Sequence, residues 1–403
     1  MKILLWATTL QADILGLAHR LDKRPASELL VVTEHLSSFR RSLIARRRPL
    51  NAPLLDRNDP KVQAAVARFR PDVVVCDNHF PPFSAAPRVC TMWHGLGWKA
   101  RPANELGSFY AQVERLTGAD PRLPNPRFLA QCYHERDRDW RVNAWGLHAQ
   151  QCAVIGSCFA DLLRGEAPYS RAEIASEYGL DPGRKTLLVN ITWHYGRIFP
   201  GSYQPSWFGR SAFDADLAFL RQVFQRAHDH EANVLFCLHD RKRYEARYLA
   251  ALHQLAHDYG PSVCLRHKDE DPDNWAALLS ADAMIGNLSS LTTFFYQLGK
   301  PAVHLCPPAS AQELHLMQYK SSSLRAQHRH AADSAIWMND PHDNGGLSAE
   351  NAEQALEAVS LVLTNPDSCR EKARAWLAAH VSDPPESASA RFERELERLA
   401  EAS

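Results

Sequence analysis

The stretch Ala281-Asp-Ala-Met-Ile-Gly-Asn-Leu-Ser-Ser-Leu291 contains an apolar run, a polar turn and the beginning of a second apolar segment. Ala283 to Ile285 is typical of a buried strand, and Leu291 to Leu298 is typical of the helix that follows it. Pro301 to Leu305 is the next strand candidate, so the segment forms one strand–helix–strand unit. Such units indicate a parallel, doubly wound sheet with helices on both faces.

The same alternation extends outward from this segment in both directions. In the first half, the strand candidates are Lys2–Ala7, Glu28–Thr33, Asp72–Cys76, Arg88–Trp93 and Gln151–Ile155. In the second half they are Thr186–Ile191, Asn233–Leu238, Ser262–Leu265, Ala283–Ile285 and, as the final strand, Pro301–Leu305. Amphipathic helix patterns lie between most of these runs, and Ser170 with Glu173 forms a capping box at the start of one helix.

A polar break after residue 164 divides the chain into two α/β parts. At 403 residues the chain is longer than one ordinary core supports, so two domains are expected. We place an N-terminal Rossmann-like domain at 1–165, a C-terminal Rossmann-like domain at 166–365 and a helical tail at 366–403. The stretch 101–145 is rich in Pro, Arg and aromatic residues, and we expect loops and helices there, over a cleft.

Composition and charge exclude several classes of protein. The formal net charge is zero, which argues against a nucleic-acid-binding protein. The nine cysteines include no C-x-x-C pair, and their apolar surroundings predict reduced, buried side chains and not disulfides or a zinc site. No signal peptide and no membrane-spanning run is evident, so we expect a cytoplasmic protein. No P-loop, G-x-G-x-x-G or G-x-S-x-G motif is present.

Candidate site residues follow the predicted strands, because ligands of doubly wound sheets bind at the carboxyl ends of strands. Trp93-His-Gly-Leu-Gly-Trp-Lys99 follows one strand, and its histidine is placed to act as a general base. Thr192 and His194 follow another strand, and His239 follows a third. The alternatives are a histidine packed between tryptophans in a turn and an aromatic loop that covers a domain.

Ser289 and Ser290 stand at the start of a predicted helix. Two hydroxyl groups and the free N–H groups of a helix N-terminus can bind a phosphate without a metal ion. A purely structural serine cap is the alternative. Asp269-Glu-Asp271 resembles a D-x-D metal motif, but its polar surroundings indicate a solvated acidic loop, so we expect no metal and no cofactor.

In their order and spacing, these segments resemble the CDP-glycerol glycerophosphotransferase family, the teichoic-acid and capsule polymerases of the GT-B fold. The family's W-H-G-T-P-L-K stretch resembles Trp93 to Lys99, and its G-x-P-R-x-D turn resembles Gly156 to Asp161. Its P-T-W-R and K-x-H-P segments resemble the stretches at 191–194 and 237–240. Its A-D-x-L-I-T-D-Y-S-S…L-x-K-P block resembles Ala281 to Pro301. Leu96, Gly97 and Trp98 replace the middle of the first stretch, and the turn keeps only Gly156 and Asp161. In the later segments, His194 stands in place of Arg, Asp240 in place of Pro, and Asn287 in place of Asp.

The resemblance implies a GT-B fold with an acceptor domain, a nucleotide-donor domain and catalysis without a metal ion. It implies that His94 is the general base, with Trp93, Gly95 and Lys99 in supporting or acceptor-binding roles. The donor-binding residues would be Thr192, His194, His239, Asn287, Ser289 and Ser290. The partners would be a nucleotide-diphosphate donor and a glycan or lipid-linked acceptor of cell-envelope polysaccharide synthesis.

Several readings of the sequence stay open. Transfer of glycerol phosphate or a similar polyol phosphate from a CDP-linked donor is the leading hypothesis, and sugar transfer from a UDP-, GDP- or CMP-linked donor is the alternative. A nucleotide-sugar 2-epimerase and a catalytically silent partner of an assembly are further readings. Arg46, Arg47 and Arg48 form a basic run that would contact the inner face of a cell membrane or an anionic acceptor, or else a solvated loop.

Overall fold

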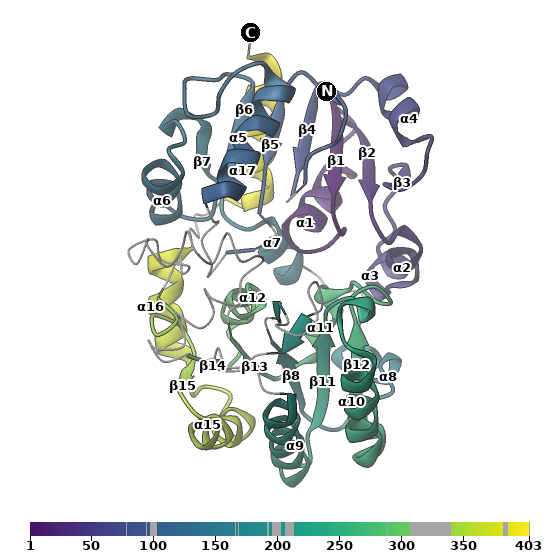
Figure 1. The fold of residues 1–403 in the computed structure, drawn as a ribbon, viewed down its shortest axis with the longest axis vertical. Coiled ribbons are helices and arrows are strands. Elements are labelled where there is room, and N and C mark those ends of the chain that lie inside the picture. The colour runs from purple at the N-terminus through teal and green to yellow at the C-terminus, as the bar shows by residue number, and fades with distance from the viewer. Residues whose placement is uncertain are drawn as a thin grey trace.

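The computed structural model describes residues 1–77, 79–93, 95–96, 103–165, 167, 169–191, 193–195, 203–205, 213–287, 289–306, 340–381 and 386–402. Within these ranges, the side chains at 103–105, 193–195, 203–205, 213–215 and 243 are not described. The described chain forms two large parallel sheets, one in each half of the molecule, and helices cover both (Figure 1).

The N-terminal sheet has seven strands in the order β3-β2-β1-β4-β5-β6-β7. They are β1 (Lys2–Ala7), β2 (Glu28–Thr33), β3 (Leu54–Asp56), β4 (Val73–Cys76), β5 (Val89–Thr91), β6 (Phe128–Cys132) and β7 (Cys152–Val154). The helices of this half are α1 (Ala12–Leu21), α2 (Leu36–Arg41), α3 (Leu43–Arg47), α4 (Val62–Phe69), α5 (Ala103–Thr117), α6 (Glu135–Trp145) and α7 (Cys158–Arg164). The strand order reverses between β1 and β4, which makes their carboxyl ends the topological switch point of the sheet.

Strand β1 shows why these apolar runs become central strands. Ile3 and Leu5 pack into the core that α1 and α7 complete, whereas Leu4 and Trp6 pack into the core that α4 and α5 complete. Successive side chains of a strand point to opposite faces, so a strand between two helical layers must be apolar at every position.

The C-terminal sheet has six strands in the order β12-β11-β8-β13-β14-β15. They are β8 (Thr186–Asn190), β11 (Asn233–Leu238), β12 (Val263–His267), β13 (Ala283–Gly286), β14 (Ala302–Leu305) and β15 (Leu347–Ala349). A separate antiparallel pair is formed by β9 (Trp193–Tyr195) and β10 (Tyr203–Pro205). The described helices after residue 170 are α8 (Arg171–Glu177), α9 (Phe213–Asp229), α10 (Ala246–Asp258), α11 (Asn274–Ser280), α12 (Leu291–Gln297), α15 (Ala352–Thr364), α16 (Arg370–His380) and α17 (Ala388–Glu401).

Most of the predicted elements are confirmed, including the capping box of Ser170 and Glu173 at the start of α8. All nine cysteines are free, and all except Cys264 are buried, as their surroundings predicted. Two expectations about strands were wrong. The stretch 101–145 contains the buried strand β6 as well as helices, and β15 follows the strand that was expected to be the last.

Helix α17, near the end of the chain, packs on the N-terminal half against α1 and α7 (Figure 1). Its buried Glu393 accepts hydrogen bonds from Arg20 at 3.0 Å and Arg24 at 2.8 Å. The Ser389 N–H and hydroxyl both donate to Asp161 at 2.7 Å. The boundaries proposed at 165 and 365 stay a prediction, but the N-terminal half is built from two separate pieces of chain.

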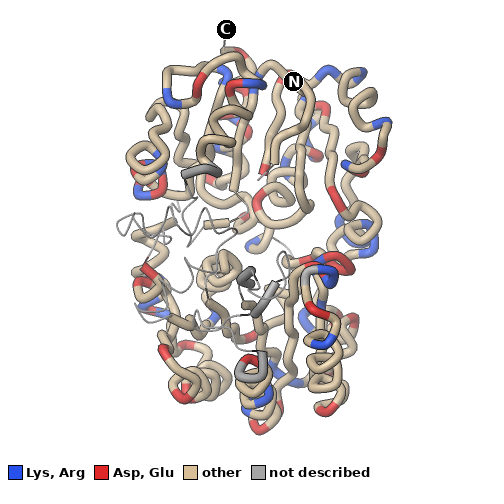
Figure 2. Tube along the Cα trace, viewed as in Figure 1, with Lys and Arg blue, Asp and Glu red and all other residues tan. Residues whose placement is uncertain are grey.

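Basic and acidic residues are interspersed over both halves of the molecule (Figure 2). Neither half carries a charge of a single sign over the described surface, in keeping with the net charge of zero.

Candidate functional site

Two turns from different halves of the molecule meet at the candidate site. Gly95 follows β5, and Ser290 follows β13 directly before α12. A Cβ atom built on Gly95 would lie 2.5 Å from Ser290 Cβ and 2.6 Å from Ser290 Oγ. Gly95 also has a φ of +137°, which side-chain-bearing residues rarely adopt. Only glycine therefore fits at this point of contact between the two motifs.

Apolar side chains pack beside this contact. Leu96 is buried in the same core cluster as Leu291 and Phe294 of α12. The Phe294 ring meets the Phe159 ring of α7 edge to face, with centroids 4.9 Å apart. The Gly95–Ser290 contact is therefore part of a packed junction between the halves.

Strand β6, which the sequence did not predict, holds the peptide groups of Trp93. The Trp93 N–H donates to Gln131 Oε1 at 3.4 Å, and the Tyr133 hydroxyl donates to the Trp93 carbonyl at 3.2 Å. Gln131 also donates to the Gly156 carbonyl at 2.6 Å. Gln131 and Tyr133 are both buried, so the turn after β5 is held by hydrogen bonds to side chains inside the protein.

Asp13 of α1 lies behind Tyr133. It accepts hydrogen bonds from the Tyr133 hydroxyl, from Ser157 Oγ at 2.7 Å and from the Phe159 N–H at 2.9 Å. Burial raises the pKa of Asp13 to about 6, because these hydrogen bonds offset only part of the cost of removing a carboxylate from water. A single acidic residue at the start of an apolar helix gave no sequence signal of this role.

The first backbone N–H groups of α12 are already hydrogen-bonded. Leu291 N–H donates to Ser289 Oγ at 3.3 Å, and the N–H groups of Thr292 and Thr293 donate to the carbonyls of Ser289 and Ser290 at 3.1 Å. The expectation that these N–H groups are free to bind phosphate was wrong, because the turn closes on itself through short-range bonds. Ser290 makes no side-chain capping bond in the described chain, so capping does not occupy its hydroxyl.

His239 and Asn287 differ in their access to solvent. The His239 side chain is 25% exposed, and its Nδ1 accepts the Asp240 N–H at 2.8 Å. Burial alone raises the pKa of Asp240, but the hydrogen bond and charge of His239, with the charges of Lys268 and His35, lower it to about 2. Asn287 is only 2% exposed, so its side chain is enclosed within the protein.

Two further residues of the 281–301 block have structural partners. Asp282 accepts the Thr186 N–H at 2.7 Å and pairs with Arg171 at 2.8 Å. Lys300 Nζ donates to three carbonyls at the end of α11, the shortest bond being 2.7 Å to Ala281. Burial lowers the pKa of Lys300 to about 8. These contacts explain the presence of Asp282 and Lys300 in the block by their role in the fold, without a role in ligand binding.

Arg46 and Arg47 of the basic run contact the protein itself. Arg46 pairs with Glu177 of α8, and the Arg47 guanidinium lies 4.6 Å from the centroid of the Tyr169 ring. Both arginines are nevertheless exposed, and Arg48 is partly exposed, so the run lies on the surface beside the junction between the halves.

A polar cluster that the sequence did not single out lies at the switch point of the N-terminal sheet. Asp77, after β4, accepts the Thr8 N–H at 2.9 Å and the Thr8 hydroxyl at 2.9 Å. Thr8 Oγ1 also lies 2.7 Å from His79 Nδ1. The sequence could have indicated this cluster, because the strands before Thr8 and Asp77 were both predicted. Ligands of doubly wound sheets bind at the switch point, where the strand order reverses.

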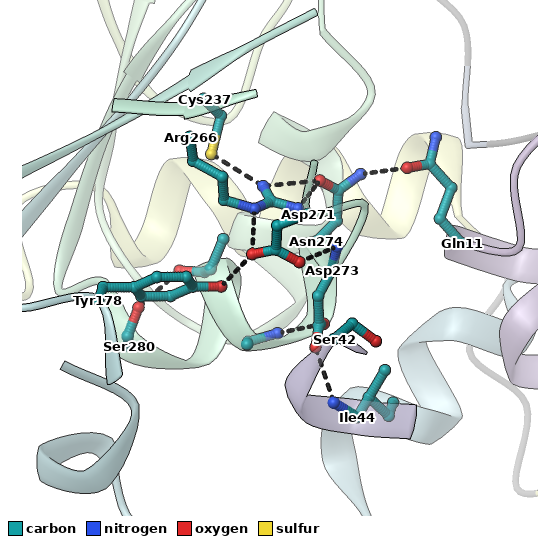
Figure 3. Close-up of polar contacts among 12 residues, drawn as sticks. Gln11, Ser42, Ile44, Tyr178, Cys237, Arg266, Asp271, Asp273, Asn274 and Ser280 are labelled. Atoms are coloured by element: carbon teal, nitrogen blue, oxygen red, sulfur yellow. Dashed lines mark hydrogen bonds and ion pairs between the residues drawn. The ribbon is translucent and has the colours of Figure 1, made fainter. Parts of the chain in front are cut away.

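The acidic loop that resembles a D-x-D motif has internal partners. Asp271 accepts hydrogen bonds from Arg266 at 2.9 Å and from Tyr178 at 3.2 Å (Figure 3). Asp269 accepts the Arg241 N–H at 3.0 Å, and Glu270 pairs with Arg241. The loop is thus an ion-paired structural element and less solvated than predicted. Across the described ranges, no group of three or more His, Cys, Asp or Glu residues is arranged to hold a metal ion.

Several predicted site residues cannot be placed. His94, Lys99 and Thr192 lie outside the described residues. His194 belongs to β9, where only the backbone is described. In the part of the chain that the structure describes, no helix is both long and apolar enough to cross a membrane.

Two Rossmann-like domains with parallel sheets, meeting at the turns after their strands, define the GT-B fold, and solved structures agree. The wall teichoic acid polymerase TagF is similar over 99% of this chain and 89% of its own, with 12% identity and a TM-score of 0.65. A UDP-N-acetylglucosamine 2-epimerase is similar over 98% and 95%, with 15% identity and a TM-score of 0.55. A glycosyltransferase from Rickettsia africae ESF-5 is similar over 100% and 99%, with 11% identity and a TM-score of 0.50.

At these identities, the likeness shows the GT-B fold, which the sequence predicted. No protein-family model matches the sequence, and no curated protein matches it.

Proposed function

We propose that this chain is a GT-B transferase that binds a nucleotide-linked donor between its two halves. The observation that carries the proposal is the contact between Gly95 and Ser290. It joins the turn after β5 to the turn after β13, and ligands of doubly wound sheets bind at the carboxyl ends of strands. Ser290 lies in the turn after β13, and the partly exposed His239 directly follows β11, at the same edge of the C-terminal sheet.

The donor we favour is a CDP-linked glycerol phosphate or similar polyol phosphate, with a cell-surface glycan or lipid-linked acceptor. Support comes from the ordered motifs between Trp93 and Pro301 and from a fold similar to that of a wall teichoic acid polymerase over 99% of the chain. On this proposal, Thr192, His194, His239, Asn287, Ser289 and Ser290 serve the donor.

In the proposed reaction, His94 removes the proton of an acceptor hydroxyl. The hydroxyl oxygen forms a bond to the phosphorus that bears the glycerol, and the bond from that phosphorus to the bridging oxygen of CMP breaks. CMP leaves with the bonding electrons, and its growing negative charge requires hydrogen-bond donors such as the Ser290 hydroxyl and His239. The donor set is proposed to need no metal ion, so a chelator should leave the rate unchanged.

Sugar transfer from a UDP-, GDP- or CMP-linked donor is the second candidate. The buried, uncharged Asn287 favours it, because the family that the sequence resembles carries an acidic residue there. In that case the acceptor oxygen attacks the anomeric carbon, and the nucleotide leaves with its phosphate oxygen.

Thermal unfolding with CDP, CMP, UDP and GDP tests both candidates. A nucleotide at a hundred times its Kd should raise the Tm by about 5 °C. A response to CDP but not to UDP or GDP supports the polyol-phosphate donor. A response to UDP or GDP, or to CMP without CDP, supports the second candidate. Ser290→Ala should weaken the response, whereas Ser37→Ala, on the exposed side of α2, should not. The proposal fails if none of the four nucleotides stabilises the protein.

A further inference from the structure

The peptide groups of Trp93 are held from both sides by two side chains of one neighbouring segment. Gln131 and Tyr133 are two residues apart along β6 and its exit, so both side chains reach the same face. One accepts the Trp93 N–H and the other donates to the Trp93 carbonyl. Because both side chains are buried, solvent does not compete for these bonds.

The Tyr133 hydroxyl has one proton and two acceptors. It contacts Asp13 Oδ2 and lies 3.2 Å from the Trp93 carbonyl. When Asp13 is ionised, the carboxylate attracts that proton away from Trp93. When Asp13 is protonated, Oδ2–H donates to the tyrosine oxygen, and the tyrosine proton is available to the Trp93 carbonyl. Asp13 Oδ1 is already occupied by Ser157 and Phe159, so Oδ2 is the oxygen that can carry the proton.

We propose that Gln131, Tyr133 and Asp13 form a positioning unit that sets the orientation of the Trp93 peptide in the turn after β5. The unit acts through Trp93 and does not touch substrate. The inference rests on the proposed function, in which His94, the next residue, is the general base. Protonation of Asp13 strengthens the hold on the Trp93 carbonyl, and its ionisation weakens that hold.

The surroundings of Asp13 leave few other groups that could produce this pH response. Asp161 of α7 acts on Asp13 through its charge, and Cys158 and Tyr133 are further titratable neighbours. Burial keeps the pKa of Cys158 and of Tyr133 well above their ordinary values, so neither ionises near neutral pH. Asp13 is the member of this group that changes state in the range where a transferase is assayed.

The test compares Tyr133→Phe, Asp13→Asn and Asp13→Ala in the full chain. Turnover of CDP-glycerol, including its hydrolysis by water, is measured as CMP release from pH 5 to pH 8. Tyr133→Phe keeps the ring and removes the hydroxyl, and kcat should fall about tenfold to a hundredfold with little change in KM. In Asp13→Asn the amide NH₂ can donate to Tyr133 permanently, so kcat should stay near the wild-type value and lose its Asp13-linked pH dependence. Asp13→Ala should resemble Tyr133→Phe.

A matched control exists in the C-terminal half. Tyr248 is buried and donates its hydroxyl to Asp216 at 2.6 Å, in the same kind of Tyr–Asp pair. Tyr248→Phe removes an equivalent bond between α9 and α10 and keeps the ring that stacks on Tyr244, so kcat should stay unchanged. An equal loss in both Tyr→Phe variants, or equal kcat for Asp13→Asn and Asp13→Ala, would overturn the proposal in favour of a general stability effect.

A second readout does not depend on activity. Amide hydrogen exchange in the peptide that covers residues 88–96 should become faster in Tyr133→Phe and Gln131→Ala, with the C-terminal peptides unaffected. If exchange changes as expected but no variant, including wild type, turns over a nucleotide donor, the proposed function is wrong and the positioning unit stands as a structural finding. If exchange in this peptide is unchanged, the unit does not hold Trp93 and the inference fails.

Discussion

Asp273, at the start of α11, accepts the backbone N–H of Ile44 from α3 at 2.8 Å and thereby connects the two halves of the molecule. Its other oxygen accepts the Ala276 N–H at 2.9 Å, so one buried carboxylate caps a helix and holds the opposite half. Figure 3 shows the bond to Ile44. Nearby, Asn274 donates to Gln11 at 3.2 Å, and Ser38 donates to the Asp269 carbonyl at 2.6 Å.

Replacement of Asp273 should loosen this connection. Asp273→Ala leaves two buried N–H groups without a partner, and we expect a loss of about 2 to 4 kcal/mol in unfolding free energy. Urea unfolding followed by circular dichroism measures the loss. Asp139→Ala, which removes an exposed carboxylate on α6, is the control and should cost less than about 1 kcal/mol. Equal losses in the two variants would contradict the assigned role.

Asp13 predicts a dependence of stability on pH. Its pKa is raised from 3.8 to about 6 in the folded protein by burial, so the folded state favours the protonated form. The stabilisation is complete below the unfolded pKa and is lost as the pH rises through about 6. Relative to wild type, Asp13→Asn should gain up to about 3 kcal/mol between pH 4 and pH 7. Urea titrations at the two pH values measure this, and a constant difference would refute the shifted pKa.

Gly95→Ala should disturb the junction for two separable reasons. The substituted residue meets Ser290 at 2.5 Å, and it must also adopt a φ of +137°. We expect a loss of about 1 to 3 kcal/mol in unfolding free energy. In the double variant with Ser290→Gly, the part of the lost unfolding free energy that comes from the contact should be recovered. The part that comes from the strained φ of residue 95 should remain. No recovery in the double variant would mean that the two residues do not meet.

His94→Ala should separate chemistry from binding. If His94 is the base, the variant should lose transfer by a factor of about 100 or more while its nucleotide-induced rise in Tm stays the same. His257→Ala, which removes an exposed histidine on α10, is the matched control and should be fully active. An active His94→Ala enzyme would require another base, and the cluster of Thr8, Asp77 and His79 would then be the first place to examine.

Contact with an anionic membrane predicts an effect of the basic run. Changing Arg46, Arg47 and Arg48 together to Gln should reduce co-sedimentation with vesicles that contain phosphatidylserine, by about 1 kcal/mol per residue at low salt. The loss of the exposed pair between Arg46 and Glu177 should cost less than about 1 kcal/mol of stability, so the variant should fold. Unchanged vesicle binding would rule out this surface as a membrane contact.

The sequence predicted the fold well because central parallel strands are continuously apolar, and this signal is local. It failed at β6, where Gln131 interrupts the apolar run and Pro and Arg residues flank it. That glutamine is buried because it bonds to the peptides of Trp93 and Gly156, which are far away in sequence. A polar residue chosen for a tertiary contact therefore concealed the strand.

The candidate site was predicted only in part for a similar reason. Motif order correctly indicated which turns belong to the ends of β5 and β13, and Gly95 and Ser290 do meet. It did not reveal that Asp282 and Lys300 of the same block have structural partners. Nor did it reveal the role of Asp13, because Asp13 and Tyr133 are 120 positions apart in the sequence and form no recognisable motif.

The return of α17 to the N-terminal half has a consequence for how the protein is made. Phe392 and Leu396 fill the core beside α1 and α7, and Glu393 neutralises Arg20 and Arg24. A ribosome completes all of β1 to β7 long before it reaches these residues. Until then, the side chains of α1 and α7 that pack on α17 lack their partner, so the N-terminal half cannot complete its core before the C-terminal sheet has also been synthesised.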